Sequence, residues 1–449
     1  MHGMPQTRSL IAKRGTTFST SMVSYPLCCP SRATYVTGQY AHNHGVKWNF
    51  EPDGGYYKLK QSETLPVWLR RAGYRTIHIG KFLNQMGERD PTEVPKGWDD
   101  WHGGVDPSTY GYYGYTLNNN GVLRTYGTSP KDYSTDVYAG LAERAIRDAK
   151  KSGKPFFLNV APLAPHTVSV ASNARMEGTP ALPAVRHYSR YANAPMPRYP
   201  NFNEADLSDK PFVAQFFPEP LTEQQIAELT DHYRGRMGSL LAVDDLVKRV
   251  VTSLKKAGVY DDTDIIFTSD NGWILGEHRF RDPQTEDGRA AGVKFLPYEG
   301  SNRVPLMAAG PDFPAGRKVS GVVVNADLAP TIADITGAKP KVAQDGVSLV
   351  RALRSPSLLR GRGVLLETFP NPRGAPPYKG IRTERYRYEY SDIGAEGLYD
   401  LKLDPWELES KHDDPRYAKV KKILAAKLAK LVNCKGTSCR VDVGTLPEP

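Results

Sequence analysis

The segment SETLPVWLRRAGYRTIHIGK, residues 62–81, joins a predicted helix directly to an apolar strand. Thr64 can cap a helix that ends near Gly73, and the stretch from Tyr74 to Ile79 has the composition of a strand. A helix that leads at once into a buried strand is the building unit of α/β folds. The segment therefore predicts an α/β domain with a mainly parallel sheet.

Two further segments have the same helix-to-strand organisation. A helix predicted from about Ser134 to Ser152 leads into the strand KPFFLNVA, residues 154–161. A capping box at Thr222 to Gln225 opens a long helix that reaches Lys256 and leads into TDIIFTSDNG, residues 263–272. Because the units repeat along the chain, we expect them to contribute to one large sheet.

Polar side chains follow each of these strands. Lys81 comes after the first strand, His166 after the second, and Asp270 with Asn271 after the third. Ligands of open α/β sheets bind at the carboxyl ends of the strands. We therefore expect these four residues to share one site.

Other parts of the chain have a different composition. Residues 169–220 are rich in Pro, Tyr and Ala, which predicts an ordered loop excursion over the site face. After about Gly363 the sequence alternates as antiparallel strands do, and a basic helix is predicted from Pro415 to Val432. We therefore predict a catalytic α/β domain over residues 1–362 and a smaller C-terminal α+β subdomain over residues 363–449.

The formal net charge is +10, and the basic residues are scattered along all 449 positions. This favours an anionic partner, although solubility alone also explains it. No nucleic-acid motif accompanies the charge, and no apolar run is long enough to span a bilayer. We expect neither a nucleic acid nor a membrane as partner.

The stretch PLCCPSRATYVTG, residues 26–38, contains two adjacent cysteines. Proline is favoured at the first position of a helix, so Pro30 predicts a short helix through Val36 that Gly38 ends. Cys29 would then lie at the helix cap and Cys28 just outside it. A helix start favours an anion or a thiolate, whereas a buried structural cysteine pair is the alternative.

The other two cysteines, Cys434 and Cys439, lie five positions apart around a glycine. A small disulfide loop in an exported protein is one interpretation, and two free surface thiols are the other.

The cysteine stretch resembles the signature of the sulfatase family, C-x-P-S-R-x-x-x-x-T-G. In that family an enzyme that generates formylglycine oxidises the first cysteine, and the hydrated aldehyde is the nucleophile. The resemblance therefore assigns formylglycine to Cys28. The matching residues are Cys28, Pro30, Ser31, Arg32, Thr37 and Gly38.

Three longer strings are similar to N-acetylglucosamine-6-sulfatases and related glycan sulfatases. They are CCPSRATYVTGQYAHNHGV (28–46), GKFLN (80–84) and VPKGWDDW (94–101). The resemblance implies an alkaline-phosphatase-like fold, with a large mainly parallel or mixed sheet flanked by helices. It also implies secretion, or a periplasmic location, and a sulfated small molecule or glycan as substrate.

The resemblance further implies a role for each residue of the site. Cys28, Arg32 and His166 would be catalytic, with His166 acting on the leaving oxygen. Lys81, Lys294 and His44 would bind the substrate. His42 and His44 are alternatives for the group that accepts the formylglycine proton.

Asp270, Asn271 and the modified Cys28 match the metal ligands of the family, and hard oxygen donors suit Ca²⁺, with Mg²⁺ as the alternative. The strand with two metal-binding aspartates that the family carries before residues 4–10 has no counterpart here. We therefore expect a truncated version of a longer secreted sulfatase, which holds its metal poorly.

These residues together predict hydrolysis of a sulfate monoester, with N-acetylglucosamine-6-sulfate as the leading substrate group. A phosphate or phosphonate ester hydrolase of the same superfamily is one alternative. An inactive, truncated glycan-binding remnant is the other.

Overall fold

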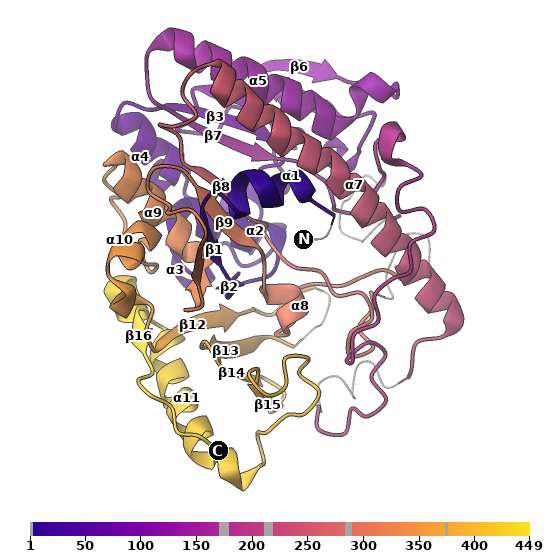
Figure 1. Cartoon of the computed structure of the whole chain (residues 1–449), viewed down its shortest axis with the longest axis vertical. Helices are drawn as coiled ribbons and strands as arrows, with labels where there is room; N and C mark the ends of the chain where they lie inside the picture. Colours follow the sequence, from indigo (N-terminus) through magenta and orange to yellow (C-terminus); the bar gives the residue numbers. More distant parts are fainter. Residues whose placement is uncertain (1–2, 170–178, 211–218, 283–289, 373–375) are drawn as a thin grey trace.

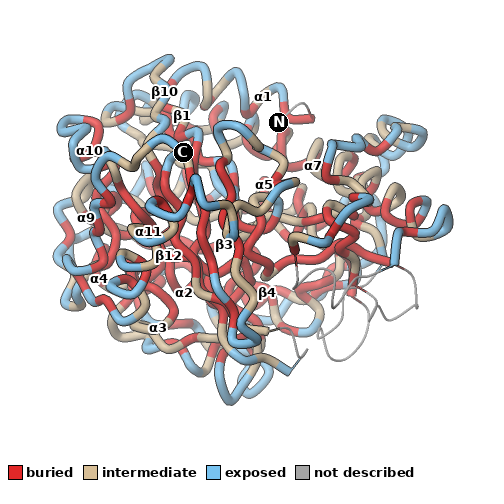
Figure 2. Tube along the Cα trace, turned by 90° about the horizontal axis from the view of Figure 1, so that it is seen from below, coloured by how far each residue is buried: buried red, intermediate tan, exposed pale blue. Residues whose placement is uncertain are grey.

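The computed structural model of the chain describes residues 3–169, 179–210, 219–282, 290–372 and 376–449. Figure 1 shows helices in front of and beside the central strands, with the C-terminal sheet and its helix at one end of the molecule. Strands in the interior are buried, whereas most connecting loops are exposed (Figure 2).

The first of the two central sheets has five strands. Strand β3 pairs in parallel with both of its neighbours, β4 and β7, while β5 and β6 add an antiparallel hairpin beyond β4. In spatial order the strands are β6 (Val122–Thr125), β5 (Thr116–Asn119), β4 (Asp100–Gly104), β3 (Arg75–Gly80) and β7 (Phe156–Ala161).

The second central sheet has four strands, and β1 pairs in parallel with β10 but antiparallel with β9. The central sheets are therefore mixed, with parallel pairs around β3 and between β1 and β10, which confirms the expectation of a mainly parallel or mixed sheet. In spatial order the strands are β10 (Arg317–Val319), β1 (Thr16–Phe18), β9 (Leu306–Ala309) and β8 (Ile265–Phe267); a separate parallel pair joins β11 (Val323–Val324) to β2 (Ser21–Met22).

Two long helices, α5 (Ser134–Ser152) and α7 (Glu223–Lys256), run side by side in Figure 1. The Arg249 guanidinium joins them by donating to Glu143 at 2.8 Å. Both helices begin at the predicted residues, and the capping box of α7 is present, because cap residues and apolar period are local signals.

Shorter helices surround the sheets. The α/β part contains α1 (Pro5–Thr7) with its π-helical continuation η1 (Arg8–Ala12), α2 (Cys28–Thr37), α3 (Ala41–His44), α4 (Leu65–Arg71), α8 (Glu299–Asn302), α9 (Leu328–Thr336) and α10 (Leu349–Arg354). The 3-10 turns are η2 (Tyr56–Lys58), η3 (Gln61–Glu63), η4 (Ser108–Tyr110), η5 (Pro130–Asp132), η6 (Val185–His187), η7 (Asn325–Asp327), η8 (Pro356–Leu358), η9 (Pro415–Tyr417) and η10 (Gly436–Cys439).

Helix α4 lies where it was predicted, but the Thr64 hydroxyl does not cap it. That hydroxyl donates to the carbonyl of Gln61 at 3.0 Å, because the preceding turn η3 places this acceptor within reach. The loop excursion predicted for residues 169–220 lies outside the described residues at 170–178 and 211–218. Its main described part, 179–210, contains the turn η6 and no longer helix or named strand.

Strands β7 and β8 are the facing edges of the two central sheets. Phe157 of β7 and Ile266 of β8 pack against the same apolar cluster, which α4 and α9 supply. Among the described strands, β7 pairs only with β3 and β8 only with β9. All residues of both strands are half-buried, although most of them are apolar.

The C-terminal sheet is antiparallel, and helix α11 (Ala418–Leu431) packs on it through Val420, Leu424 and Leu428. Cys434 and Cys439 form a disulfide, so the disulfide interpretation of this pair is confirmed. In spatial order the strands are β15 (Glu396–Asp400), β14 (Tyr386–Ser391), β13 (Tyr378–Arg382), β12 (Arg362–Glu367) and β16 (Val441–Asp442).

None of the helices in the described ranges is long and apolar enough to cross a membrane.

Candidate active site

Helix α2 presents the cysteine pair. It begins at Cys28, two residues before the predicted start, and Gly38 ends it with a left-handed φ of 69°. The earlier start is allowed because Pro30 then occupies the first turn, where a helix uses no backbone N–H. Cys28 is therefore a residue of the first turn, and the prediction that it lies outside the helix was wrong. Both cysteines are buried.

Two distant segments bring ammonium groups to the Cys28 sulfur, and a third brings His166 beside them. The ammonium group of Lys81, which follows β3, lies 3.5 Å from Sγ. That of Lys294 lies 3.6 Å from the same atom and 3.3 Å from Nε2 of His166. The predicted neighbours of Cys28 thus meet at the carboxyl ends of β3 and β7.

These cations change the acidity of Cys28. Burial alone would raise the pKa of the thiol, but the nearby ammonium groups of Lys294 and Lys81 and a hydrogen bond with His166 lower it to about 5. At neutral pH the group is therefore a thiolate.

The neighbouring Cys29 has the opposite character. Its Sγ accepts a hydrogen bond from the backbone N–H of Asn84 at 3.0 Å and lies 3.7 Å from the carbonyl of Asn49. Burial raises its pKa well above the ordinary value, and the negative charge at Cys28 raises it further. Cys29 is therefore a packed thiol behind the reactive position.

Arg32 and Asp270 form a half-buried ion pair next to the lysines. Arg32 Nε donates to Asp270 at 2.8 Å, and its Nη1 donates to the Lys81 carbonyl at 2.7 Å. Burial would raise the pKa of Asp270, but Arg32, Lys81 and Lys294 lower it to about 2, so it stays ionised. The pair fixes the end of β3 against the segment that follows β8.

Asn271 and Asp270 could contribute to a metal site. The Asn271 Oδ1 atom is buried and has no hydrogen-bond partner among the described residues, while its Nδ2 donates to the Gly272 carbonyl at 2.8 Å. An orphaned amide oxygen beside an ionised carboxylate suits a hard cation. Within the described ranges no three His, Cys, Asp or Glu side chains gather around one point, so these residues supply only part of a coordination shell.

Both ring nitrogens of His44 have protein partners. Nε2 lies 3.1 Å from the Thr34 hydroxyl, and Nδ1 accepts from the Val46 N–H at 3.1 Å. Burial lowers its pKa to about 3, so the ring is neutral. A direct substrate contact by His44 stays a prediction, and these bonds give the ring a role in joining α2 to α3.

His42 lies between the two parts of the molecule. Its Nδ1 is 3.1 Å from Glu367 and its Nε2 is 2.8 Å from the Cys434 carbonyl. Burial lowers its pKa, but the Glu367 carboxylate more than offsets this and the net pKa is raised. Because both ring nitrogens of His42 are engaged by Glu367 and Cys434, this residue is better suited to anchoring the C-terminal loop than to accepting a proton from the modified Cys28.

Two aromatic residues that were not predicted also line the site. The Lys81 ammonium lies 4.4 Å from the Tyr110 ring centroid, and the Lys294 ammonium lies 4.9 Å from that of Trp273. Trp273 directly follows the SDNG motif, so its position next to predicted site residues could have indicated that it lines the site. Tyr110 lies in a tyrosine-rich stretch without any motif, so only the tertiary structure identifies it.

Residues 1–338 match the sulfatase family, and residues 293–434 match the C-terminal part of N-sulphoglucosamine sulphohydrolase. The chain belongs to the sulfatase family. It is accordingly a sulfuric ester hydrolase, and the resemblance carried by residues 28–38 is confirmed.

Two curated relatives illustrate the similarity. An arylsulfatase of Volvox carteri is 34% identical, over 97% of this chain and 72% of its own length. The human N-acetylglucosamine-6-sulfatase is 35% identical, over 82% of this chain and 64% of its own length. The arrangement of this sulfatase is also close to the structure of BT4656 in complex with its substrate D-glucosamine-2-N,6-O-disulfate, with a TM-score of 0.73, 24% identity and coverage of 95% and 92% of the two chains. The fold is thus alkaline-phosphatase-like, as expected.

Proposed function

We propose that this sulfatase removes the sulfate group from a sulfated sugar, with an N-acetylglucosamine-6-sulfate-like unit as the leading substrate. The observation that carries the proposal is the pair of ammonium groups within 3.6 Å of the Cys28 sulfur. Two fixed positive charges at one nucleophilic position suit a group that gains negative charge in the transition state. The similarity to the human N-acetylglucosamine-6-sulfatase supports a sulfated sugar as the substrate.

Each side chain of the site has an expected task. Lys81 and Lys294 would hold the sulfate oxygens, and Arg32 would keep the nucleophilic position at a positive potential. His166 would act as the general acid that protonates the leaving oxygen. Its Nε2 would carry that proton, because its Nδ1 is held 2.9 Å from the Thr167 carbonyl. When Cys28 is oxidised to formylglycine, one hydroxyl of the hydrated aldehyde would attack the sulfur of the ester. The second hydroxyl would then expel sulfate, which restores the aldehyde. A Ca²⁺ ion, for which Asp270 and Asn271 provide oxygen ligands, would supply Lewis-acid chemistry.

The maturation of Cys28 is tested by peptide mass spectrometry. The protein should be produced with and without a formylglycine-generating enzyme, which we propose as its maturation partner. We expect the aldehyde at Cys28 and an unmodified thiol at Cys29, with activity in proportion to conversion. Full activity with an unmodified Cys28 would contradict the proposed nucleophile.

The substrate class is tested with a panel of 6-sulfated N-acetylglucosamine, other sulfated monosaccharides, aryl sulfates and phosphonate esters. We expect the first to have the highest kcat/KM, and Cys28→Ala to abolish its turnover. Cleavage of aryl sulfates or phosphonate esters alone would contradict the sugar assignment.

We also propose export from the cytoplasm, because the Cys434–Cys439 disulfide persists in oxidising compartments. Fractionation of the source cells, with activity measured in each fraction, tests this location.

A further inference from the structure

Both lysines of the site are almost fully withdrawn from water. Lys81 and Lys294 each have 3% of their surface exposed. An ammonium group that loses its water needs other partners, and two such groups at one sulfur also repel each other. Each ammonium group instead lies close to the centroid of an aromatic ring, Tyr110 for Lys81 and Trp273 for Lys294.

The same two rings contact His166. The Tyr110 and His166 ring centroids are 5.3 Å apart at an interplanar angle of 65°. Those of Trp273 and His166 are 6.0 Å apart at 64°. Each ring therefore contacts both a lysine and the imidazole. Lys81, Lys294 and His166 thus pack against the same two aromatic rings.

We propose that Tyr110 and Trp273 are positioning residues of the sulfatase reaction, which hold Lys81, Lys294 and His166 in place through their ring faces and edges. This inference rests on the function proposed for the Cys28 site. It concerns residues that belong to no signature motif of the sequence.

An aromatic ring suits this position because it attracts a cation without carrying a formal negative charge. A carboxylate in the same place would also stabilise the ammonium group, but it would repel the sulfate ester. A cation over an aromatic face is stabilised by the ring, and more strongly where water is excluded than at an exposed site. The rings thus keep both lysines charged and directed at Cys28 without weakening anion binding.

Outer contacts keep both rings in place. Tyr110 is 2% exposed, and its carbonyl accepts from the Ser169 N–H at 3.4 Å. The Arg236 guanidinium lies 5.0 Å from the Trp273 centroid and donates to the Pro165 carbonyl at 2.9 Å, one residue before His166. The position of Trp273 is thereby coupled to that of the histidine loop.

The test compares substitutions that keep an aromatic face with substitutions that remove it. Tyr110→Phe keeps the face, and no described residue hydrogen-bonds to the hydroxyl that it removes. Tyr110→Leu removes the face, and Trp273→Phe and Trp273→Leu form the second pair. We expect the Phe variants to stay within about threefold of the parent and each Leu variant to lose about tenfold in kcat/KM.

Binding of inorganic sulfate, measured by calorimetry on the parent and each variant after Cys28→Ala removes the thiolate, gives a readout that needs no turnover. We expect the Leu variants to bind sulfate about tenfold more weakly and the Phe variants to bind it like the parent. Tyr115→Leu is the matched control, since this buried ring contacts Tyr126 and Tyr138 instead of a lysine. It should leave both quantities unchanged.

Equal sulfate affinity and kcat/KM in the Leu and Phe variants overturn the proposal, as does a parent protein that binds no sulfate. Ring-dependent sulfate binding without cleavage of any sulfate ester supports the positioning role and contradicts the proposed function. Melting temperatures show whether each variant is folded. If Tyr110→Leu does not fold, Tyr110→Met removes the same ring with an unbranched side chain.

Discussion

At the scale of single residues, two neighbouring cysteines of one helix turn have opposite chemistry. Cys28 lies against two ammonium groups, whereas Cys29 lies against backbone atoms of Asn84 and Asn49. The difference in pKa therefore comes from what each sulfur contacts, since both are buried.

The two cysteines should differ in their reaction with iodoacetamide. In unconverted, metal-free protein, alkylation of Cys28 should rise as pH increases through about 5 and stay constant above that, because only the thiolate reacts. Cys29 should stay unlabelled at neutral pH, because burial raises its pKa. Labelling at each position is measured by peptide mass spectrometry from pH 4 to pH 9. A Cys28 midpoint near the ordinary value of about 8.5 would refute the electrostatic account.

Removing one site lysine should impair catalysis more than folding. Lys81→Ala or Lys294→Ala should lower kcat by roughly 100-fold or more, since one preorganised charge donor contributes about 3 kcal/mol to transition-state stabilisation. Steady-state kinetics with a sulfate ester measure the loss. Lys248→Ala, a substitution at an exposed position of α7, is the control. Activity of a site variant within twofold of the parent would show that its ammonium group is not used.

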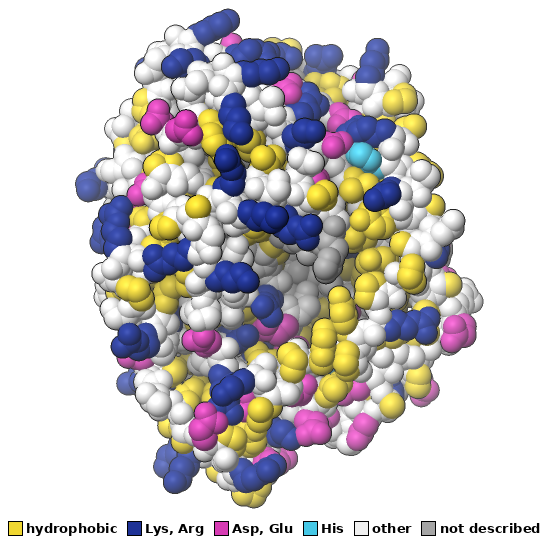
Figure 3. Space-filling model, viewed as in Figure 1, with side chains coloured by type: hydrophobic (Ala, Val, Ile, Leu, Met, Phe, Trp, Pro, Cys, Tyr) yellow, Lys and Arg dark blue, Asp and Glu magenta, His cyan; other side chains and the backbone are white. Residues whose placement is uncertain are grey.

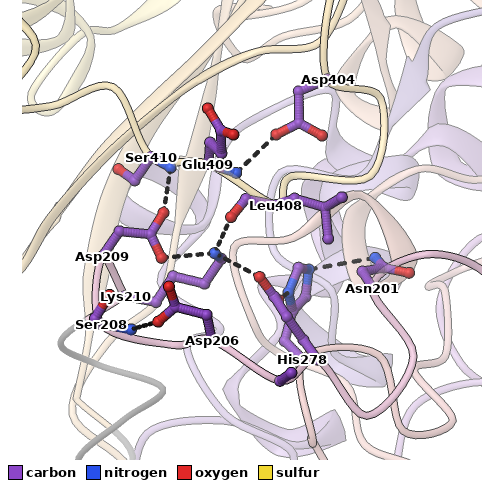
Figure 4. A network of polar contacts seen from close by, with 12 residues as sticks. Asn201, Asp206, Ser208, Asp209, Lys210, His278, Asp404, Leu408, Glu409 and Ser410 are labelled. Atoms are coloured by element: carbon purple, nitrogen blue, oxygen red, sulfur yellow. Dashed lines mark hydrogen bonds and ion pairs between the residues drawn. The ribbon is translucent and has the colours of Figure 1, made fainter.

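At the scale of elements, buried ion networks join segments that the sequence separates widely. Figure 4 shows the loop that contains Asp209 and Lys210 joined to the C-terminal loop, where the Lys210 ammonium donates to the Leu408 carbonyl. The Lys210 ammonium donates to Glu204 at 2.9 Å, and Glu204 also contacts Nδ1 of His278 at 2.5 Å. The network thus holds the described part of the loop excursion against the C-terminal sheet region.

Breaking this network should destabilise the protein. Lys210→Met should lower the free energy of unfolding by about 3–5 kcal/mol, because it leaves the buried Glu204 carboxylate without its cation. Urea unfolding followed by circular dichroism measures the change. Lys248→Met, at the exposed position on α7, should alter stability by no more than about 0.5 kcal/mol. An equally small effect at both positions would mean that the Lys210 network does not stabilise the fold.

At the level of the whole molecule, the two central sheets present β7 and β8 to the same apolar cluster, and a C-terminal sheet docks beside them. The docking uses His42 and Asn43, which both contact the Cys434 carbonyl next to the disulfide. Lys and Arg side chains are scattered over the face in Figure 3, without a single basic patch.

The open edge of β7 should be visible in hydrogen exchange. Strand β3 is paired on both sides, so its amides should be among the slowest in the protein to exchange. Among the described strands β7 pairs on one side only, so its alternate amides should exchange at least about tenfold faster than those of β3. Mass spectrometry of overlapping peptides from both strands measures the rates. Equal protection along the two strands would show that another segment covers the edge of β7 in solution.

Local patterns in the chain were enough to predict the helix-to-strand units and the helix starts at Ser134 and Glu223. They were also enough to group the polar residues that follow the strands. Caps, apolar period and the strand-end rule depend only on neighbouring residues or on a general property of α/β sheets. The residues that surround Cys28 come from segments up to 266 positions away, so their distances depend on how the sheets pack. The mixed pairing of the sheets and the places of the Tyr110 and Trp273 rings beside the lysines therefore follow from long-range packing, which local patterns do not encode.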